Sequence, residues 1–262
     1  MKTRFVIKCG GSTLAALPDA FFEDLRALHA NGYEPVIVHG GGPAINEALA
    51  KLGIESRFVN GLRVTDEATL DVVEMMLAGR INKDIVRRLQ QNGARALGLS
   101  GTDGRLIEAR PVADAATLGL VGDVVGVNAT LIEGVLALGY VPVIAPIGID
   151  AAGQRYNINA DIAAGAVASH LGAEKLIVVT DVPGILRNEN GEKRVLPRAT
   201  FADIERMIAT GEIYGGMIPK VRAAMSGLQG RVREVLIVDG VIPRVLSRAL
   251  HEGDIGTRIV RE

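Results

Sequence analysis

The stretch that decides the fold is Pro35–Asn46, PVIVHGGGPAIN, in which a β-branched run meets three glycines and then a helix-like run. The run Pro35–Val38 does not alternate between apolar and polar residues, which is typical of a strand buried on both faces of a parallel sheet. Pro43 suits the first turn of the following helix, where a missing N–H costs nothing. The glycines indicate a sharp turn of the backbone or the close approach of a ligand.

The same order of strand and helix runs along the whole chain. Apolar runs predict strands at Phe5–Ile7, Arg95–Leu99, Val141–Ala145, Lys175–Thr180, Val235–Val238 and Thr257–Val260. Helical patterns are found at about Asp19–Ala30, Pro43–Leu52, Asn128–Leu138, Asp161–Leu171, 201–210 and 217–229. This alternation predicts an α/β fold, an open and mostly parallel sheet with helices on both faces. No repeat or linker divides the chain, so we expect one compact domain with two lobes.

The region from residue 58 to residue 91 interrupts this order. Asn60-Gly61 predicts a hairpin between short strands, and Thr65 is expected to cap a helix that runs to about Gln91. The apolar face of that helix consists of Leu70, Val73, Leu77, Ile81, Ile85 and Leu89. This face either covers the sheet or forms a dimer surface, and the sequence leaves both open. Further on, Val121–Val127 is expected to be an antiparallel strand.

Composition narrows the class of protein. The 262 residues carry a net charge of −1, with 48% hydrophobic and 3% aromatic residues. No long basic run or aromatic platform favours nucleic acid or a membrane surface as a partner. The single cysteine, Cys9, is expected to be a small buried strand residue. No signal peptide or membrane-spanning stretch is apparent, so we expect a cytoplasmic protein.

Two glycine-rich turns follow predicted strands: Lys8–Ser12 (KCGGS) and Gly40–Gly42. In parallel sheets ligands bind at the carboxyl ends of strands, and helix N-termini there favour anions. A tight turn without a ligand explains one such stretch equally well, but two of them, with Lys8 at a strand tip, favour anion binding. The P-loop and dinucleotide-binding signatures are absent. The four histidines are scattered, which disfavours a metal site, and His39 is expected to be structural.

Three other polar stretches stand out, and each has a structural alternative. Asn157–Asp161 (NINAD) precedes a helix, where a simple N-cap needs only one of its polar side chains. Thr180–Leu186 (TDVPGIL) follows a buried strand. Gly215–Lys220 (GGMIPK) places a lysine in the first turns of a helix, and taken alone it is read best as a surface lysine.

Taken in chain order, these glycine-rich and polar stretches resemble the amino acid kinase superfamily and, within it, the acetylglutamate kinases. The matching stretches are KCGGS, VHGGGPAIN, NGLRVT, GLSGTDG, NINAD, TDVPGIL and GGMIPKV, which run from residue 8 to residue 221. The resemblance implies an αβα sandwich with a substrate-binding N-terminal lobe, about 1–173, and an ATP-binding C-terminal lobe, about 174–262. It also implies ATP-dependent phosphorylation of the side-chain carboxylate of N-acetyl-L-glutamate, the second step of arginine synthesis.

The resemblance also implies roles for individual residues. Lys8 and Lys220 would neutralise the transferring phosphoryl group from opposite sides, and Asp161 would orient both ammonium groups. A carboxylate nucleophile is already ionised at pH 7, so no general base is needed. Backbone N–H groups of Gly10, Gly11 and Gly41 would bind the phosphoryl oxygens.

The remaining implied roles concern the two substrates. Arg63 would pair with the α-carboxylate of the acyl amino acid, and Gly41, Gly42, Asn157 and Asn159 would also contact that substrate. The ATP pocket would be lined by Thr180, Asp181, Val182, Pro183, Gly184, Ile185, Leu186, Glu212, Ile213 and Tyr214. Mg²⁺ would be bound mainly by the ATP phosphates, with no dedicated protein ligands.

Two rival functions remain open. One is a carrier-bound aminoadipate kinase of lysine synthesis, although NGLRVT fits the acetylglutamate type better. The other is a non-catalytic nucleotide or amino-acid sensor, against which the retention of Lys8, Asp161 and Lys220 argues. The resemblance also bears on regulation: arginine-inhibited relatives carry an extra N-terminal helix, whereas this sequence starts almost directly in its first predicted strand. We therefore expect an arginine-insensitive homodimer.

Overall fold

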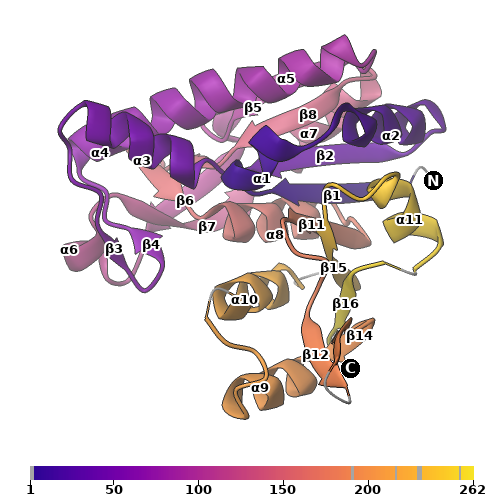
Figure 1. Cartoon of the computed structure of the whole chain (residues 1–262). Helices are drawn as coiled ribbons and strands as arrows, with labels where there is room; N and C mark the ends of the chain where they lie inside the picture. Colours follow the sequence, from indigo (N-terminus) through magenta and orange to yellow (C-terminus); the bar gives the residue numbers. More distant parts are fainter. Residues whose placement is uncertain (1–2, 190–191, 216, 229–231, 254) are drawn as a thin grey trace.

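In the part of the chain that the structure describes, eight strands form the central sheet, in the order β14-β16-β15-β11-β1-β2-β8-β5; Figure 1 shows the arrangement of the elements. All neighbouring pairs are parallel except β15 with β16. The strands are β1 Arg4–Cys9, β2 Glu34–His39, β5 Ala96–Ser100, β8 Val141–Ala145, β11 Lys175–Thr180, β14 Arg198–Thr200, β15 Glu234–Asp239 and β16 Thr257–Val260. The structure is a computed structural model and describes residues 3–189, 192–215, 217–228, 232–253 and 255–262. It confirms the predicted α/β fold.

Helices cover both faces of this sheet (Figure 1). One face packs against α2 Asp19–Ala30, α5 Asn82–Gln91 and α11 Val245–His251, and the other against α7 Ala129–Ala137, α8 Ala160–His170, α9 Phe201–Ala209 and α10 Met217–Gly227. Strand β1 serves both cores because side chains alternate along a strand: Phe5 and Ile7 join the first and Val6 joins the second. The predicted end of α10, residue 229, lies outside the described residues.

The helix that was predicted to begin at residue 66, after a cap at Thr65, begins one residue later, at Glu67. Asp66 caps α4, Glu67–Glu74, by accepting a hydrogen bond from the Thr69 N–H at 2.8 Å. The prediction that Thr65 is the cap was wrong. Thr65 is fully buried, and its hydroxyl donates to the Arg63 carbonyl oxygen at 2.8 Å and accepts from the Asn157 amide, so it does not cap the helix.

The same segment contains a π-helix, Met75–Ile81, between α4 and α5. The only signal in the sequence is Ala78-Gly79, which weakens an α-helix at this point. The predicted apolar face is buried at Leu70, Val73, Leu77, Ile85 and Leu89. This face therefore covers the core of its own chain, which was one of the two interpretations.

The other elements surround the carboxyl ends of the central strands. They are α1 Gly11–Ala16, α3 Gly42–Lys51, the hairpin β3 Phe58–Val59 with β4 Leu62–Arg63, α6 Ala115–Leu118, and the hairpin β12 Leu186–Glu189 with β13 Glu192–Val195. A small closed sheet consists of β6 Ile107–Pro111, β7 Val121–Val127, β9 Ile147–Ile149 and β10 Arg155–Ile158. The prediction of an antiparallel strand at β7 is confirmed by its pairing with β6, and β7 also pairs in parallel with β10.

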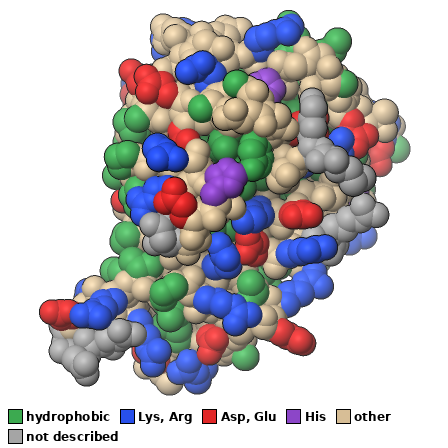
Figure 2. All heavy atoms as spheres, turned by 90° about the vertical axis from the view of Figure 1, so that its right-hand side faces the viewer, with side chains coloured by type: hydrophobic (Ala, Val, Ile, Leu, Met, Phe, Trp, Pro, Cys, Tyr) green, Lys and Arg blue, Asp and Glu red, His purple; other side chains and the backbone are tan. Residues whose placement is uncertain are grey.

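The surface resembles that of an ordinary globular protein on the face that Figure 2 shows. Lys and Arg side chains on this face have Asp and Glu side chains among them, without an uninterrupted basic stripe (Figure 2). In the described part of the chain, no helix combines the length and the apolar character needed to cross a bilayer.

Candidate active site

The two glycine turns lie side by side because the strands that precede them are neighbours. β1 and β2 pair in parallel, with Lys8 opposite Val38 and Cys9 opposite His39. A Cβ on Gly11 would lie 2.6 Å from the Cα of Gly41, so the two turns touch through their backbones. Glycine at this point is required by close packing of one turn on the other.

Gly41 is also closed in from a second direction. A Cβ there would collide with Ile81 and would lie 2.8 Å from Leu77, both on the π-helix. A Cβ on Gly42 would meet nothing within 4 Å. Packing therefore explains Gly11 and Gly41, whereas the space beside Gly42 opens into a cavity.

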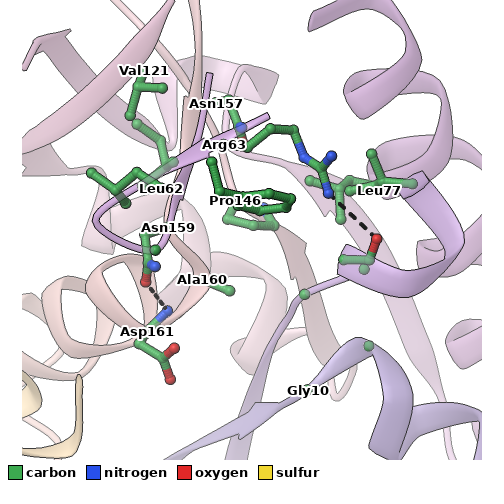
Figure 3. A pocket seen from close by; sticks show the side chains of 18 of the residues that line it. Gly10, Leu62, Arg63, Leu77, Val121, Pro146, Asn157, Asn159, Ala160 and Asp161 are labelled. Carbon is green, nitrogen blue, oxygen red and sulfur yellow. Dashed lines mark hydrogen bonds between the residues drawn. The ribbon is translucent and has the colours of Figure 1, made fainter. Parts of the chain in front are cut away.

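This cavity has a volume of about 230 Å³, which suits a small metabolite. Figure 3 shows Arg63 and Asn157 on one side of it, and Asn159 and Asp161 at the start of α8 on another. The lining brings together most of the predicted phosphoryl and acyl amino acid residues: Lys8, Gly10, Gly11, Gly41, Gly42, Arg63, Asn157, Asn159 and Asp161. Segments from residue 8 to residue 161 thus meet at one site.

Lys8 forms the ionic centre of the cavity with Asp161. Lys8 shares the face of β1 with Val6, the face on which α8 packs, so its side chain reaches the first turn of that helix. The Lys8 Nζ lies 2.9 Å from the Asp161 Oδ1, and the two side chains are only 14% and 21% exposed. A single ammonium group is therefore fixed beside the glycine turns.

The side chains of the NINAD stretch both stabilise local structure and line the cavity. The Asn159 Oδ1 caps α8 by accepting from the N–H groups of Asp161 and Ile162, at 2.8 and 3.2 Å. The Asn157 amide donates to the Thr65 hydroxyl at 3.1 Å. One residue is thus the N-cap, as the structural alternative allowed, while both line the cavity.

Lys220 has a different partner from the expected one. Its Nζ lies 2.7 Å from the Asp181 Oδ1, and this contact is the main cause that lowers the Asp181 pKa. Asp161, in contrast, pairs with Lys8 alone among the described residues. In this structure Asp161 thus holds one of the two lysines, and its expected role of orienting both stays a prediction. Lys220 lies in the first turns of α10, within reach of the carboxyl end of β11, where Asp181 follows the strand. Gly216 of the GGMIPK stretch lies outside the described residues.

Arg63 reaches the cavity from β4 and is only 7% exposed. Its Nη2 donates to the Asn46 Oδ1 at 2.6 Å and to the Gly42 carbonyl oxygen at 3.4 Å, and its Nη1 donates to the Ser56 hydroxyl. The guanidinium also lies 4.7 Å from the centroid of the Phe58 ring. Burial lowers the pKa of this guanidinium. The sequence did not mark Asn46 and Ser56 as site residues, although Asn46 ends the glycine-rich stretch Pro35–Asn46.

The two stretches predicted to hold a nucleotide converge beyond the carboxyl end of β11, the strand that pairs with β1. Ile185 and Ile213 belong to the same buried core, and the Arg187 Nε lies 3.9 Å from the Glu212 Oε2. Asp181 and Tyr214 are exposed. Ile185 and Ile213 are at most 2% exposed, so the predicted contact of their side chains with a ligand has no open surface in this structure.

Several side chains in these stretches hold the chain in shape. The Thr180 hydroxyl donates toward the Val182 and Val238 carbonyl oxygens, at 3.0 and 3.2 Å. Gly184 has φ +142°, and a Cβ there would lie 2.7 Å from the Thr257 hydroxyl oxygen. These residues fix the path of the loop after β11.

His39 and Asn82 form a buried polar pair behind the glycine turns, and the sequence indicated only His39. His39 is completely buried, its Nε2 lies 3.2 Å from the Asn82 amide, and its Nδ1 lies 3.3 Å from the Gly40 oxygen. The ring therefore donates through Nδ1 and accepts through Nε2. Burial lowers the His39 pKa to about 4 and raises that of Cys9 to about 12. The structural interpretations of His39 and Cys9 are confirmed.

The sequence of this chain matches a known protein family and known relatives. The family model described as "Amino acid kinase family" matches residues 3–239. An acetylglutamate kinase of Geobacillus sp. (strain WCH70) is 49% identical over 262 residues, which cover 100% of this chain and 98% of that protein. An acetylglutamate kinase of Geobacillus kaustophilus is 53% identical over 235 residues, or 90% of this chain and 89% of that protein.

A solved structure shows the same likeness in three dimensions. The protein smu.665 of Streptococcus mutans UA159 superposes with a TM-score of 0.86 at 34% identity, covering 100% of both chains. The family match spans the glycine turns, the cavity and α10. The chain therefore belongs to the amino acid kinase family.

Proposed function

We propose that this kinase transfers the γ-phosphoryl group of ATP to the γ-carboxylate of N-acetyl-L-glutamate, giving N-acetyl-L-glutamyl 5-phosphate and ADP. The observation that carries the proposal is the Lys8–Asp161 pair, set beside two glycine turns in a cavity that Arg63 also lines. The names of relatives at 49% and 53% identity support acetylglutamate as the acceptor, in preference to a carrier-bound aminoadipate.

The cavity suits an acceptor that is already an anion. Among the described residues, no histidine lines it, and His39 lies behind the glycine turn with its pKa lowered to about 4. A carboxylate acceptor needs no general base, because it is ionised at pH 7. What the chain must supply is alignment of two anions and compensation of charge on the transferring group.

The charge is compensated by Lys8 and by the N–H groups of Gly10, Gly11 and Gly41, in this proposal. Asp161 holds the Lys8 ammonium in place and accepts no proton. Lys220 completes the arrangement from the opposite side once it leaves Asp181. Breaking the Lys220–Asp181 pair costs little free energy, because an exposed ion pair contributes only about 0–1 kcal/mol.

The acyl amino acid is held on the other side of the cavity. Arg63 pairs with its α-carboxylate through the planar guanidinium. Gly42, Asn157 and Asn159 contact the rest of the substrate, where the open side of Gly42 leaves room for it. This half of the site belongs to the proposed substrate lobe, about residues 1–173.

The nucleotide lies against the proposed ATP lobe, about residues 174–262. Asp181 and Tyr214 offer exposed surface, and the loop from Thr180 through Val182 and Pro183 to Leu186 forms the wall. Among the described residues, no three metal-ligating side chains gather in one place. The Mg²⁺ that accompanies ATP is therefore proposed to bind mainly to the phosphates, whose negative charge it offsets.

The proposed assembly is a homodimer in the cytoplasm. Strand β5 lies at the edge of the central sheet, and Leu97 on it is 40% exposed. Met75 on the π-helix is 60% exposed. An open sheet edge with exposed apolar side chains favours pairing with a second copy, and light scattering after size-exclusion chromatography measures the mass directly.

A coupled ADP-release assay tests the function. The panel contains N-acetyl-L-glutamate, L-glutamate, N-acetyl-L-aspartate and an N-acyl-aminoadipate. We expect turnover with N-acetyl-L-glutamate to exceed turnover with each of the others at least tenfold in kcat/KM. Nucleotide binding without ADP release would favour a sensor, and preference for the aminoadipate would favour the lysine-pathway activity.

A further inference from the structure

Among the described residues, the hydrogen-bond partners of Arg63 are all neutral. Asn46 on α3, Ser56 in the loop after it and the Gly42 carbonyl accept from the two terminal nitrogens. The Ser56 hydroxyl donates in turn to the Asn46 Oδ1 at 3.1 Å. Three side chains from different segments thus form a closed network that fixes the guanidinium plane at the cavity wall.

Other arginines of this chain are held by carboxylates. Arg155 pairs with Asp71 and Glu74, and Arg4 pairs with Glu34 and Glu133. No carboxylate lies within ion-pair distance of Arg63 in the part of the chain that the structure describes, although Arg63 is only 7% exposed. A cation so deeply placed costs free energy unless an anion reaches it.

We infer that Asn46 and Ser56 are positioning residues which hold Arg63 by neutral acceptors and so leave its charge for the carboxylate of the acyl amino acid. The inference rests on the proposed function. An aspartate at position 46 would have the same shape as asparagine and would accept the same hydrogen bonds more strongly. It would also pair with the guanidinium and compete with the substrate.

The test is Asn46→Asp, assayed for KM and kcat with each substrate. We expect the KM for N-acetyl-L-glutamate to rise about tenfold to a hundredfold, the range expected for weakening a hydrogen-bonded charge contact. The kcat at saturation and the KM for ATP should stay within about twofold of the parent enzyme. Asn46→Ala, which removes one acceptor and adds no charge, should raise the same KM less than Asn46→Asp does.

Two controls isolate the charge. Glu47→Gln changes the neighbouring exposed residue, whose partner is Lys51, and should leave all constants unchanged. The α-amide of N-acetyl-L-glutamate keeps the γ-carboxylate that is phosphorylated but lacks the charge that Arg63 would bind. The difference between the parent and Asn46→Asp should disappear with this analogue.

An unchanged KM in Asn46→Asp would overturn the inference while leaving the proposed function in place. A loss confined to kcat, or an equal loss with the α-amide, would also overturn it, because the residue would then act on something other than carboxylate binding. Lack of any activity on N-acetyl-L-glutamate in the parent chain would contradict the proposed function and the inference together.

Discussion

The two lysines of the site are held in very different ways. Lys8 lies on a central strand, and its side chain and that of Asp161 are 14% and 21% exposed. Lys220 lies in the first turns of α10, and its side chain and that of Asp181 are 35% and 66% exposed. The half of the site built on the central sheet is thus preformed, whereas the proposed role of Lys220 requires it to exchange its partner first. Substitutions at Lys8 and Lys220 separate these two behaviours.

The largest effect is expected for Lys8→Ala. Removal of a fixed cation beside the transferring group should lower kcat at least a hundredfold. The variant should also lose about 1–3 kcal/mol of stability, because Asp161 keeps its partly buried charge without a partner. Enzyme assays and urea unfolding measure the two effects. Lys51→Ala, which removes an exposed cation paired with Glu47, is the control.

Lys220→Ala should lower kcat by a similar factor but leave the free energy of unfolding within about 1 kcal/mol of the parent, since its pair is exposed. Arg222→Ala, an exposed cation on the same helix, should change neither quantity. Near-normal turnover in Lys220→Ala would remove this residue from the phosphoryl site.

Arg63→Ala tests the preformed half from the substrate side. We expect a rise of about tenfold to a hundredfold in the KM for N-acetyl-L-glutamate, because a charge-assisted contact is lost. The KM for ATP should be unaffected, since the proposed nucleotide pocket lies in the other half. An unchanged KM for the acyl amino acid would reject Arg63 as its carboxylate ligand.

Gly41→Ala and Gly42→Ala form a matched pair one residue apart. A methyl group on Gly41 collides with Ile81 and Leu77 and should cost about 1–3 kcal/mol of stability through overpacking. A methyl group on Gly42 meets open space and should leave stability unchanged. Thermal unfolding compares the two, and equal melting temperatures would show that the π-helix does not constrain the turn.

His39 adds a pH dependence to the preformed half. Its pKa falls from 6.5 to about 4 on folding, so the unfolded chain binds the proton more readily between these values. The contribution is complete above pH 6.5 and is lost as the pH falls toward 4. Between pH 7 and pH 5 it should remove about 2 kcal/mol from the free energy of unfolding. His39→Gln should lack this part of the decline, and an identical decline in both proteins would contradict the assignment.

The sequence predicted the preformed half well because that half follows from local rules. Strand patterns place Lys8 and the glycines at neighbouring strand ends, and α2 begins and ends where its periodicity indicated. The partner of Lys220 depends on the distance between α10 and the end of β11, which no local pattern encodes. The π-helix was missed because its register change leaves the apolar spacing almost intact. The network around Arg63 joins residues 46, 56 and 63, which come together only through the packing of the hairpin on α3.

The most direct test is a crystal structure with N-acetyl-L-glutamate and a non-hydrolysable ATP analogue. We predict that the Lys8 and Lys220 ammonium groups both lie within hydrogen-bond distance of the terminal phosphoryl oxygens, that Asp161 still holds Lys8, and that Lys220 has left Asp181. A ternary complex in which Lys220 remains paired with Asp181, away from the phosphates, would contradict this account.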